Sequence, residues 1–286
     1  MKISALDDHQ CHLGEGPLWD VVEQALYWVD SYAPRLFRYD SASARTESWK
    51  LSGGQVGSLA LRERGGLILA MDQGFYAFEP QTGEVEAIAI PLAGRQDLRL
   101  NDGKVDPFGS FVAGGMNIDY RQSENCPMFR LSPRLEVEEI LDGFECFNGP
   151  CFDEAGDLLY VTGRDEGVIE VFDYGSAQKP RNGRVLLEGC NPDGATVDAE
   201  GFIWSAQWDD ECLLRISPDG EVDTRLQVPG QIVSSVTFGG NELDQIFVTT
   251  VGDEVHGAVP AGELPGRLLV IEDSGFRGRA ESRFKG

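Results

Sequence analysis

The chain has 286 residues, of which 41% are hydrophobic, and a formal net charge of −24. A charge of this sign and size repels phosphate backbones and anionic lipid surfaces, so we expect neither nucleic acid nor a membrane as a partner. No stretch approaches the roughly 18–20 apolar residues of a membrane span, and the first eight residues are too polar for a secretory signal. We therefore expect a cytoplasmic protein.

Short apolar segments recur along the chain at intervals of about 40–50 residues. Taken in chain order, we predict the first strand of each repeat at 25–30, 67–71, 111–116, 158–162, 202–206 and 246–250. A second strand is predicted after each one, at 36–39, 75–78, 128–131, 168–172, 212–216 and 267–271. Most repeats add a third, at 85–90, 137–141, 185–188 and 224–228. Such a period is typical of four-stranded propeller blades, so the predicted fold is all-β, a six-bladed β-propeller.

The repeat is continuous, and no long Pro/Ser/Gly linker interrupts it. We therefore expect a single domain over residues 1–286. The sixth repeat has little apolar sequence after Ile271, so we expect residues 3–6 to add a strand there, close the ring and cover the sheet edges. The six cysteines are scattered, without a Cys-x-x-Cys pair, and are expected to be small core residues in a reducing compartment.

Acids and amides recur at one position of the repeat. A loop aspartate aligns four units, at 20, 106, 153 and 198, and five residues before it stand Glu15, Asn101, Asn148 and Asp193. The same count gives Gly57 in the second unit and either Ser234 or Ser235 in the sixth. Since the innermost strands of a propeller surround a channel, equivalent residues at their entrance are expected to converge on its axis.

Two carboxylates and two amides around a narrow axis predict a bound cation. Carboxylates at close range raise each other's pKa, and a divalent cation removes this cost. Carboxylate and amide oxygens suit hard cations, and a site with few protein ligands leaves positions for water or substrate. We expect one divalent ion, with calcium as the first choice and magnesium, manganese and zinc as alternatives. Each Asn-Gly or Asp-Gly pair alone would be read as a turn; their shared repeat position favours a site.

The same segments resemble the senescence marker protein/regucalcin/gluconolactonase family. The most specific is Arg99-Leu100-Asn101-Asp102-Gly103-Lys104-Val105-Asp106-Pro107, and others are 13–20, 26–30, 148–149, 192–201 and 237–240. They fall in five of the six repeats. The resemblance implies a six-bladed propeller that hydrolyses a sugar-acid lactone with a divalent metal.

Carried over residue by residue, the resemblance implies metal ligands at Glu15, Asn148 and Asp193. It implies that Arg99 and Asn101 contact the substrate, that Asp193 is also the base that activates water, and that Asp119 is an acidic substrate contact. The chain departs from the family at Gly114-Gly115-Met116, where Gly-Thr-Met is usual, and in the loop 117–126. That loop is expected at the mouth of the site, so the resemblance does not fix the sugar.

The expected reaction is hydrolysis of the lactone to the aldonic acid. The cation would polarise the lactone carbonyl while Asp193 accepts a proton from the attacking water. Arg99 is expected to orient the sugar, with a rim ion pair as the alternative role. The sequence contains no Gly-x-Ser-x-Gly elbow, and its three histidines, His9, His12 and His256, offer little for a Ser-His-Asp arrangement.

Two other function classes stay open. The same ligands would serve a non-catalytic, calcium-binding regulatory propeller, in which the ion is enclosed and not open to solvent. A scaffold for protein partners would need exposed aromatic side chains on the rim, for which Trp49 and Trp208 are candidates; Trp208 is also a candidate for the sugar pocket or the core. No obligate protein partner is indicated, and the expected partner is a small-molecule sugar lactone.

Overall fold

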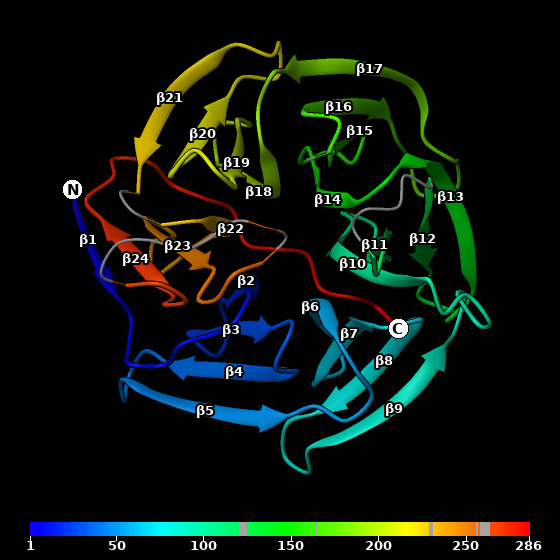
Figure 1. The fold of residues 1–286 in the computed structure, drawn as a ribbon, viewed down its shortest axis with the longest axis horizontal. Coiled ribbons are helices and arrows are strands. Elements are labelled where there is room, and N and C mark those ends of the chain that lie inside the picture. Colours follow the sequence, from blue (N-terminus) through cyan, green and yellow to red (C-terminus); the bar gives the residue numbers. More distant parts are fainter. Residues whose placement is uncertain (120–124, 164, 229–230, 256, 258–263) are drawn as a thin grey trace.

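The computed structural model describes residues 1–119, 125–163, 165–228, 231–255, 257 and 264–286. Over these residues the protein is all-β, with six four-stranded antiparallel sheets arranged as blades around a central axis (Figure 1). The predicted six-bladed propeller is thus confirmed. Within the same residues, no helix combines the length and the apolar character that a membrane crossing requires.

Each blade runs from an innermost strand at the axis to an outermost strand at the rim. The innermost strands are β2 (Gly14–Asp20), β6 (Val56–Leu61), β10 (Leu98–Val105), β14 (Phe147–Phe152), β18 (Pro192–Val197) and β22 (Val233–Gly239). The second strands are β3 (Ala25–Asp30), β7 (Leu67–Met71), β11 (Phe111–Asn117), β15 (Leu158–Gly163), β19 (Ile203–Gln207) and β23 (Gln245–Thr250). The third strands are β4 (Arg35–Asp40), β8 (Gly74–Glu79), β12 (Cys126–Leu131), β16 (Val168–Asp173), β20 (Cys212–Ile216) and β24 (Leu269–Glu272). The outermost strands are β5 (Arg45–Lys50), β9 (Glu84–Ala89), β13 (Val137–Phe144), β17 (Arg181–Glu188), β21 (Val222–Gln227) and β1 (Lys2–Ala5).

The structure corrects the predicted start of each repeat. The segments predicted as first strands are the second strands of the blades, because the residues before them already form the innermost strands. Strands β3, β7, β11 and β19 are buried at every position, and a strand buried on both faces reads as a continuous apolar run. The innermost strands carry polar residues, glycine and proline, so the same criterion missed them.

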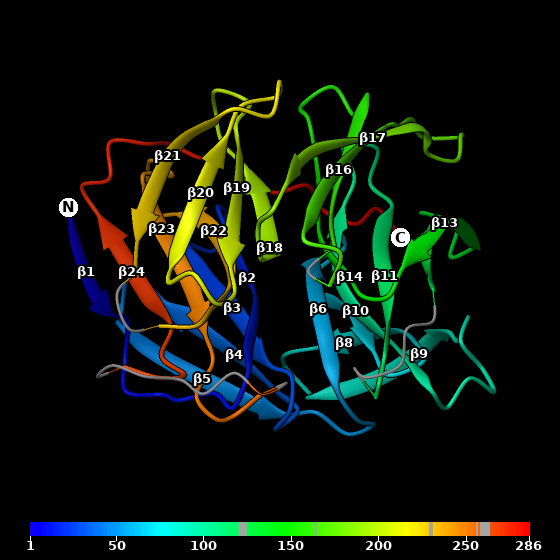
Figure 2. The ribbon, with the colours of Figure 1, turned by 45° about the horizontal axis from the view of Figure 1, so that its top comes forward.

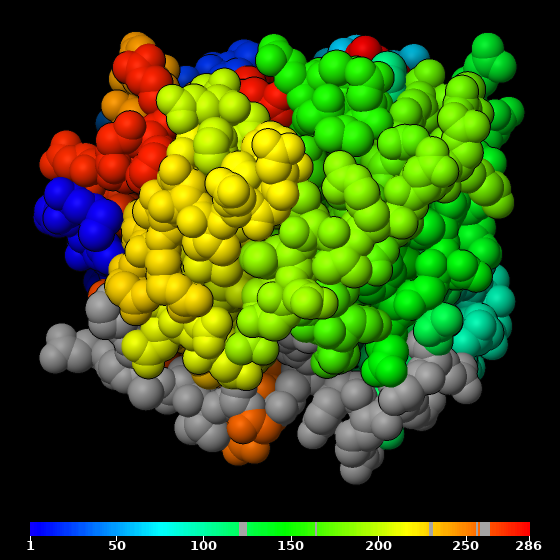
Figure 3. Space-filling model, turned by 90° about the horizontal axis from the view of Figure 1, so that it is seen from above, coloured from blue at the N-terminus to red at the C-terminus, as the bar shows by residue number. Residues whose placement is uncertain are grey.

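The hydrophobic core is divided among clusters between neighbouring blades. One cluster joins blades one and two, another joins blades four and five, and a third joins blades five and six. Blades six and one meet through stacked rings of Phe247 and Trp19, whose centroids are 5.6 Å apart. Figure 3 shows blades four and five from outside as adjoining green and yellow walls. All six cysteines lie in the described residues, where they are buried and form no disulfide.

Both ends of the chain are fixed to the propeller. Strand β1 pairs antiparallel with β24, so it forms the outermost strand of the sixth blade. Residues 273–286, here called the C-terminal segment, cross the face of the ring where the innermost strands end (Figure 1). Gly278 bridges to Asp198, just after β18, and Phe284 bridges to Arg62, just after β6. The repeated acids and amides lie at the opposite, starting ends of these strands.

Candidate active site

The predicted site residues come from the innermost strands of four blades. Glu15 lies in β2, Asn101 in β10, Asn148 in β14 and Asp193 in β18, while Arg99 precedes Asn101 in β10. Each innermost strand contacts the innermost strands of both neighbouring blades. The six strands therefore surround one axis (Figure 1), and the repeated position occurs around one end of it.

Every innermost strand is distorted at the repeated position. Its pairing with the second strand shifts in register there, between Glu15 and Leu18, Val56 and Ser58, Leu100 and Gly103, Asn148 and Cys151, Pro192 and Ala195, and Val233 and Ser235. A bulge of this kind bends the strand and changes the direction of a side chain. The repeat in the sequence therefore corresponds to a repeated backbone irregularity at the mouth of the channel.

Glycines allow the innermost strands to approach one another at these bulges. Gly149 has a φ of +50°, and a Cβ atom there would lie 2.7 Å from the carbonyl oxygen of Asp193. At Gly57, a Cβ atom would lie 2.3 Å from the carbonyl oxygen of Asn101. Only glycine fits such close backbone contact. The Asp193 carbonyl also accepts a hydrogen bond from Thr162 Oγ1 at 2.8 Å, so blade four fixes the Asp193 backbone in blade five.

The two amides meet across blades three and four. Asn101 Nδ2 donates to Asn148 Oδ1 at 2.6 Å and to the Phe147 carbonyl at 3.0 Å. Asn148 is buried, whereas Asn101 is partly exposed. The hydrogen bonds fix the orientation of both amides and leave Asn101 within reach of a molecule that enters from the mouth.

The site holds buried negative charge. Loss of solvent, followed by the charges of Asp193 and Asp102, raises the pKa of Glu15 well above its usual range, while Arg99 opposes the shift. Arg99 is 3% exposed, and burial lowers its pKa against the opposing effect of Cys146 and other neighbours. Its Nη1 donates to the Leu100 carbonyl at 3.0 Å. The Arg99 guanidinium therefore lies near the buried Glu15 carboxyl group, on which the charges of Asp193 and Asp102 also act.

The donor set fits a hard divalent cation. Glu15 and Asp193 supply carboxylate oxygens and Asn148 supplies an amide oxygen, which are the ligands that such cations take. A cation between them would relieve the repulsion that raises the pKa of Glu15. Among the described residues, no three His, Cys, Asp or Glu side chains could hold an ion by themselves. An ion here would thus depend on the Asn148 amide and on water or substrate.

Asp119 lies at the same end of blade three. It is partly buried in a bend just after β11, whose last residue, Asn117, pairs with Leu98 at the start of β10. The loop 117–126 continues from it, and residues 120–124 of that loop lie outside the described residues. Its predicted contact with the substrate therefore stays a prediction.

Two further residues, Asp102 and Cys146, belong to this arrangement and were not among the predicted site residues. Asp102 Oδ2 accepts the backbone N–H of Gly149 at 2.8 Å, and the charge of Asp102 acts on Glu15. Cys146 Sγ lies 3.5 Å from Asn101 Nδ2 and 3.7 Å from the Nδ2 of Asn148. The repeat alignment chose one position per blade, so it passed over Asp102 next to Asn101.

The remaining candidate residues, at the mouth and on the rim, contact other parts of the protein or are exposed. Trp208 is 4% exposed and packs in an apolar cluster with Leu13, Ile232, Val251 and Val255. Trp49 is partly buried, with its ring edge-to-face on Phe78. His12 is exposed and pairs with Asp253, whereas His256 lies outside the described residues. Neither tryptophan therefore presents the exposed aromatic face that a scaffold role would need.

Comparisons with known proteins agree on one family. A family model described as "SMP-30/Gluconolactonase/LRE-like region" matches residues 13–252. The chain is 32% identical to a 6-deoxy-6-sulfogluconolactonase of Pseudomonas putida over 83% of each chain. It is 30% identical to a pentonolactonase of Haloferax volcanii, covering 99% of this chain and 98% of that one. A crystal structure of a calcium-binding regucalcin from Agrobacterium tumefaciens superimposes with a TM-score of 0.89 at 23% identity, covering 98% of this chain and 96% of that one.

Proposed function

The chain belongs to the SMP-30/gluconolactonase/LRE-like family, and we propose that it hydrolyses a sugar-acid lactone to the aldonic acid. The observation that carries this proposal is the convergence of Glu15, Asn101, Asn148 and Asp193 at one end of the channel, with Arg99 beside them. Two relatives named as sugar lactonases, at 32% and 30% identity, support the same class of substrate.

In this proposal Glu15, Asn148 and Asp193 hold one divalent cation. Their oxygens favour calcium, and magnesium, manganese and zinc are the alternatives. When bound, the cation would act as a Lewis acid toward the lactone carbonyl. Supporting evidence is the buried negative charge that raises the pKa of Glu15, because this charge needs compensation before all the carboxylates can ionise.

Asp193 is the proposed general base. Its carboxylate would accept a proton from the water that attacks the lactone carbonyl, and such catalysis is typically worth about 10²–10⁴-fold. The base must be held in place, and the Asp193 backbone is restrained by Thr162 Oγ1 at 2.8 Å and by the close contact with Gly149. Because the base is already held in place, little further conformational entropy is lost when it is positioned for the attack of water.

Arg99 and Asn101 are the proposed substrate-binding residues, with Asp119 as a third. The Arg99 guanidinium is a charge-assisted donor for sugar hydroxyls and ring oxygen. Asn101 is partly exposed at the mouth and its amide is already oriented by Asn148 and Phe147. Asp119 would accept from a sugar hydroxyl. In these roles the three residues bind and orient the lactone and transfer no proton.

A calcium-binding regulatory propeller without activity is the second candidate, favoured by the structural match to the calcium-binding regucalcin. An ion with a purely structural role is enclosed by protein ligands. Here Glu15 and Asn101 keep partial exposure while Asn148 and Asp193 are buried. This combination favours a site that is open on one side, as catalysis requires.

The test is a panel of aldonolactones assayed with chelated protein and after return of each metal. Asp193→Asn keeps an oxygen ligand but loses the basic carboxylate, so at saturating metal kcat should fall by about 10²-fold or more. Asn101→Ala should mainly raise KM, because its amide is assigned to the sugar. Wild-type turnover by Asp193→Asn at full metal occupancy would exclude Asp193 as the base. No hydrolysis of any lactone, together with tight calcium binding, would favour the regulatory candidate.

A further inference from the structure

The C-terminal segment closes the channel on the side opposite the site. It runs from blade five, where Gly278 bridges to Asp198, to blade two, where Phe284 bridges to Arg62 (Figures 1 and 2). Phe284 is fully buried in the core cluster of blades two to four. The residues between these two anchors therefore lie across the end of the channel.

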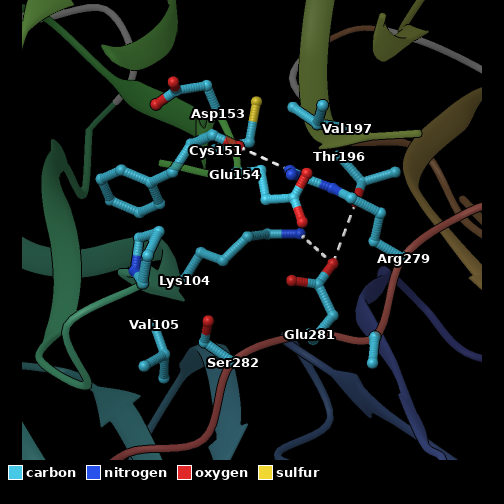
Figure 4. A pocket seen from close by; sticks show the side chains of 13 residues that line it. Lys104, Val105, Cys151, Asp153, Glu154, Thr196, Val197, Arg279, Glu281 and Ser282 are labelled. Atoms are coloured by element: carbon cyan, nitrogen blue, oxygen red, sulfur yellow. Dashed lines mark hydrogen bonds and ion pairs between the residues drawn. The ribbon is translucent and has the colours of Figure 1, made fainter. Parts of the chain in front are cut away.

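One side chain of this segment forms an ion pair beneath the site. Glu281 Oε1 lies 2.8 Å from Lys104 Nζ and accepts a hydrogen bond from Thr196 Oγ1 at 2.9 Å (Figure 4). Both charged side chains are largely buried, with 14% of Glu281 and 19% of Lys104 exposed. Although burial raises it, Lys104 and Thr196 hold the pKa of Glu281 below its usual range. Glu281 is therefore charged and neutralises Lys104.

The charge of a second carboxylate, that of Asp102, also acts on Lys104. Lys104 follows Asp102 by two residues in β10; burial raises the pKa of Asp102, and the charge of Lys104 and the N–H groups of Gly149 and Gly103 oppose this shift. Asp102 is engaged on the site side: Oδ2 accepts the Gly149 N–H and Oδ1 accepts the Gly103 N–H, each at 2.8 Å. The Gly149 hydrogen bond holds the bulge directly after Asn148. Asp102 therefore connects the ion pair at the back of the channel to the amide and carboxylates at its mouth.

We propose that Glu281 is a positioning residue of the cation site, because it neutralises Lys104 and so leaves the Asp102 carboxylate to hold the Gly149 bulge and to add its negative charge to the site. This inference rests on the cation site of the proposed function. Without Glu281, the buried ammonium of Lys104 would face Asp102 as its nearest uncompensated carboxylate. It would then compete for the Asp102 oxygens and reduce the negative potential that attracts a divalent ion.

The direction in which each substitution changes the affinity for the cation distinguishes this role from a purely structural one. Glu281→Gln removes a negative charge and should weaken cation binding. Lys104→Met removes the opposing positive charge and, at a pH well above the raised pKa of Asp102, should leave cation binding unchanged or make it tighter. The double variant removes both charges and should bind as the wild type does. A purely structural ion pair would instead predict that both single variants are impaired in the same sense.

The experiment is calorimetric titration of calcium into chelator-treated, full-length protein. We expect affinity to fall on the order of tenfold in Glu281→Gln and to recover in Glu281→Gln with Lys104→Met. Thr196→Val is the matched control, because it removes the other hydrogen bond to Glu281 and keeps every charge; its affinity should stay near that of the wild type. Equal affinity for wild type and Glu281→Gln, or impairment of both single variants, would overturn the inference.

A second measurement needs no metal. Hydrogen exchange of the peptide 147–152 in chelated protein should be faster in Glu281→Gln than in wild type, and normal in the double variant, because the Gly149 N–H loses its Asp102 acceptor. Unchanged exchange would contradict the inference even if Glu281→Gln proves unstable. Failure of the wild type to bind any divalent cation would refute the proposed cation site itself, whereas normal binding with an unaffected Glu281→Gln would refute only the role of Glu281.

Discussion

Gly149→Ala tests whether the close contact between blades four and five positions Asp193. A residue with a Cβ atom at a φ of +50° pays about 1–2 kcal/mol for the left-handed conformation. The new Cβ would also lie 2.7 Å from the Asp193 carbonyl oxygen and 2.8 Å from two side-chain atoms of Thr162. Overpacking of this kind costs about 1–3 kcal/mol, so the free energy of unfolding should fall by about 2–5 kcal/mol in all.

Gly189→Ala is the matched control. Gly189 has a φ of +70°, and a Cβ atom there would meet nothing within 4 Å, so this variant pays only the backbone strain of about 1–2 kcal/mol. Urea denaturation of the two variants gives the difference, which isolates the contact with Asp193 and Thr162. Because the two strain costs are similar, the difference should equal the overpacking cost of about 1–3 kcal/mol.

The same variant should affect activity below its unfolding transition. An ordinary van der Waals contact begins near 3.4 Å, so Asp193 would have to retreat by about 0.7 Å, and displacement on this scale reduces turnover by about tenfold or more. Lactone hydrolysis and calcium affinity should both be measured on folded protein. Equal losses of stability in Gly149→Ala and Gly189→Ala, with unchanged turnover in both, would refute the idea that Gly149 fixes Asp193.

Two further outcomes follow from the buried charges and from the C-terminal segment. Because burial and the charges of Asp193 and Asp102 raise the pKa of Glu15 above its usual 4.5, its contribution to stability is fully present below that value and is lost as pH rises through the raised pKa. Chelated protein should thus lose free energy of unfolding with rising pH, and Glu15→Gln should flatten this loss; identical pH profiles would contradict the assignment. Phe284→Ala should cost about 3–5 kcal/mol because Phe284 is fully buried. Phe108→Ala, at an exposed position, is the control and should lower the free energy of unfolding by about 0.5 kcal/mol or less. Similar losses in the two variants would show that the C-terminal segment contributes little to stability.

The number of blades and a polar position shared by four repeats could both be predicted from the sequence, and the structure confirms the six blades. Buried second strands such as Ala25–Asp30 read as apolar runs because both of their faces pack on neighbouring blades. The spacing of the loop aspartates then identified Glu15, Asn101, Asn148 and Asp193 as equivalents, and in the structure each of them lies in the innermost strand of its blade. The apolar runs and the aspartate spacing each involve residues that are close in the sequence, and both patterns recur in successive blades.

The sequence did not predict which groups act on one another at the axis, because these contacts join distant parts of the chain. The innermost strands escaped prediction because their bulges and glycines interrupt the apolar pattern. The hydrogen bond between Asp102 and Gly149 joins positions 47 residues apart, and the ion pair between Lys104 and Glu281 joins positions 177 residues apart. No periodicity encodes such pairs, because they depend on how the closed ring and the returning C-terminal segment bring distant parts of the chain together.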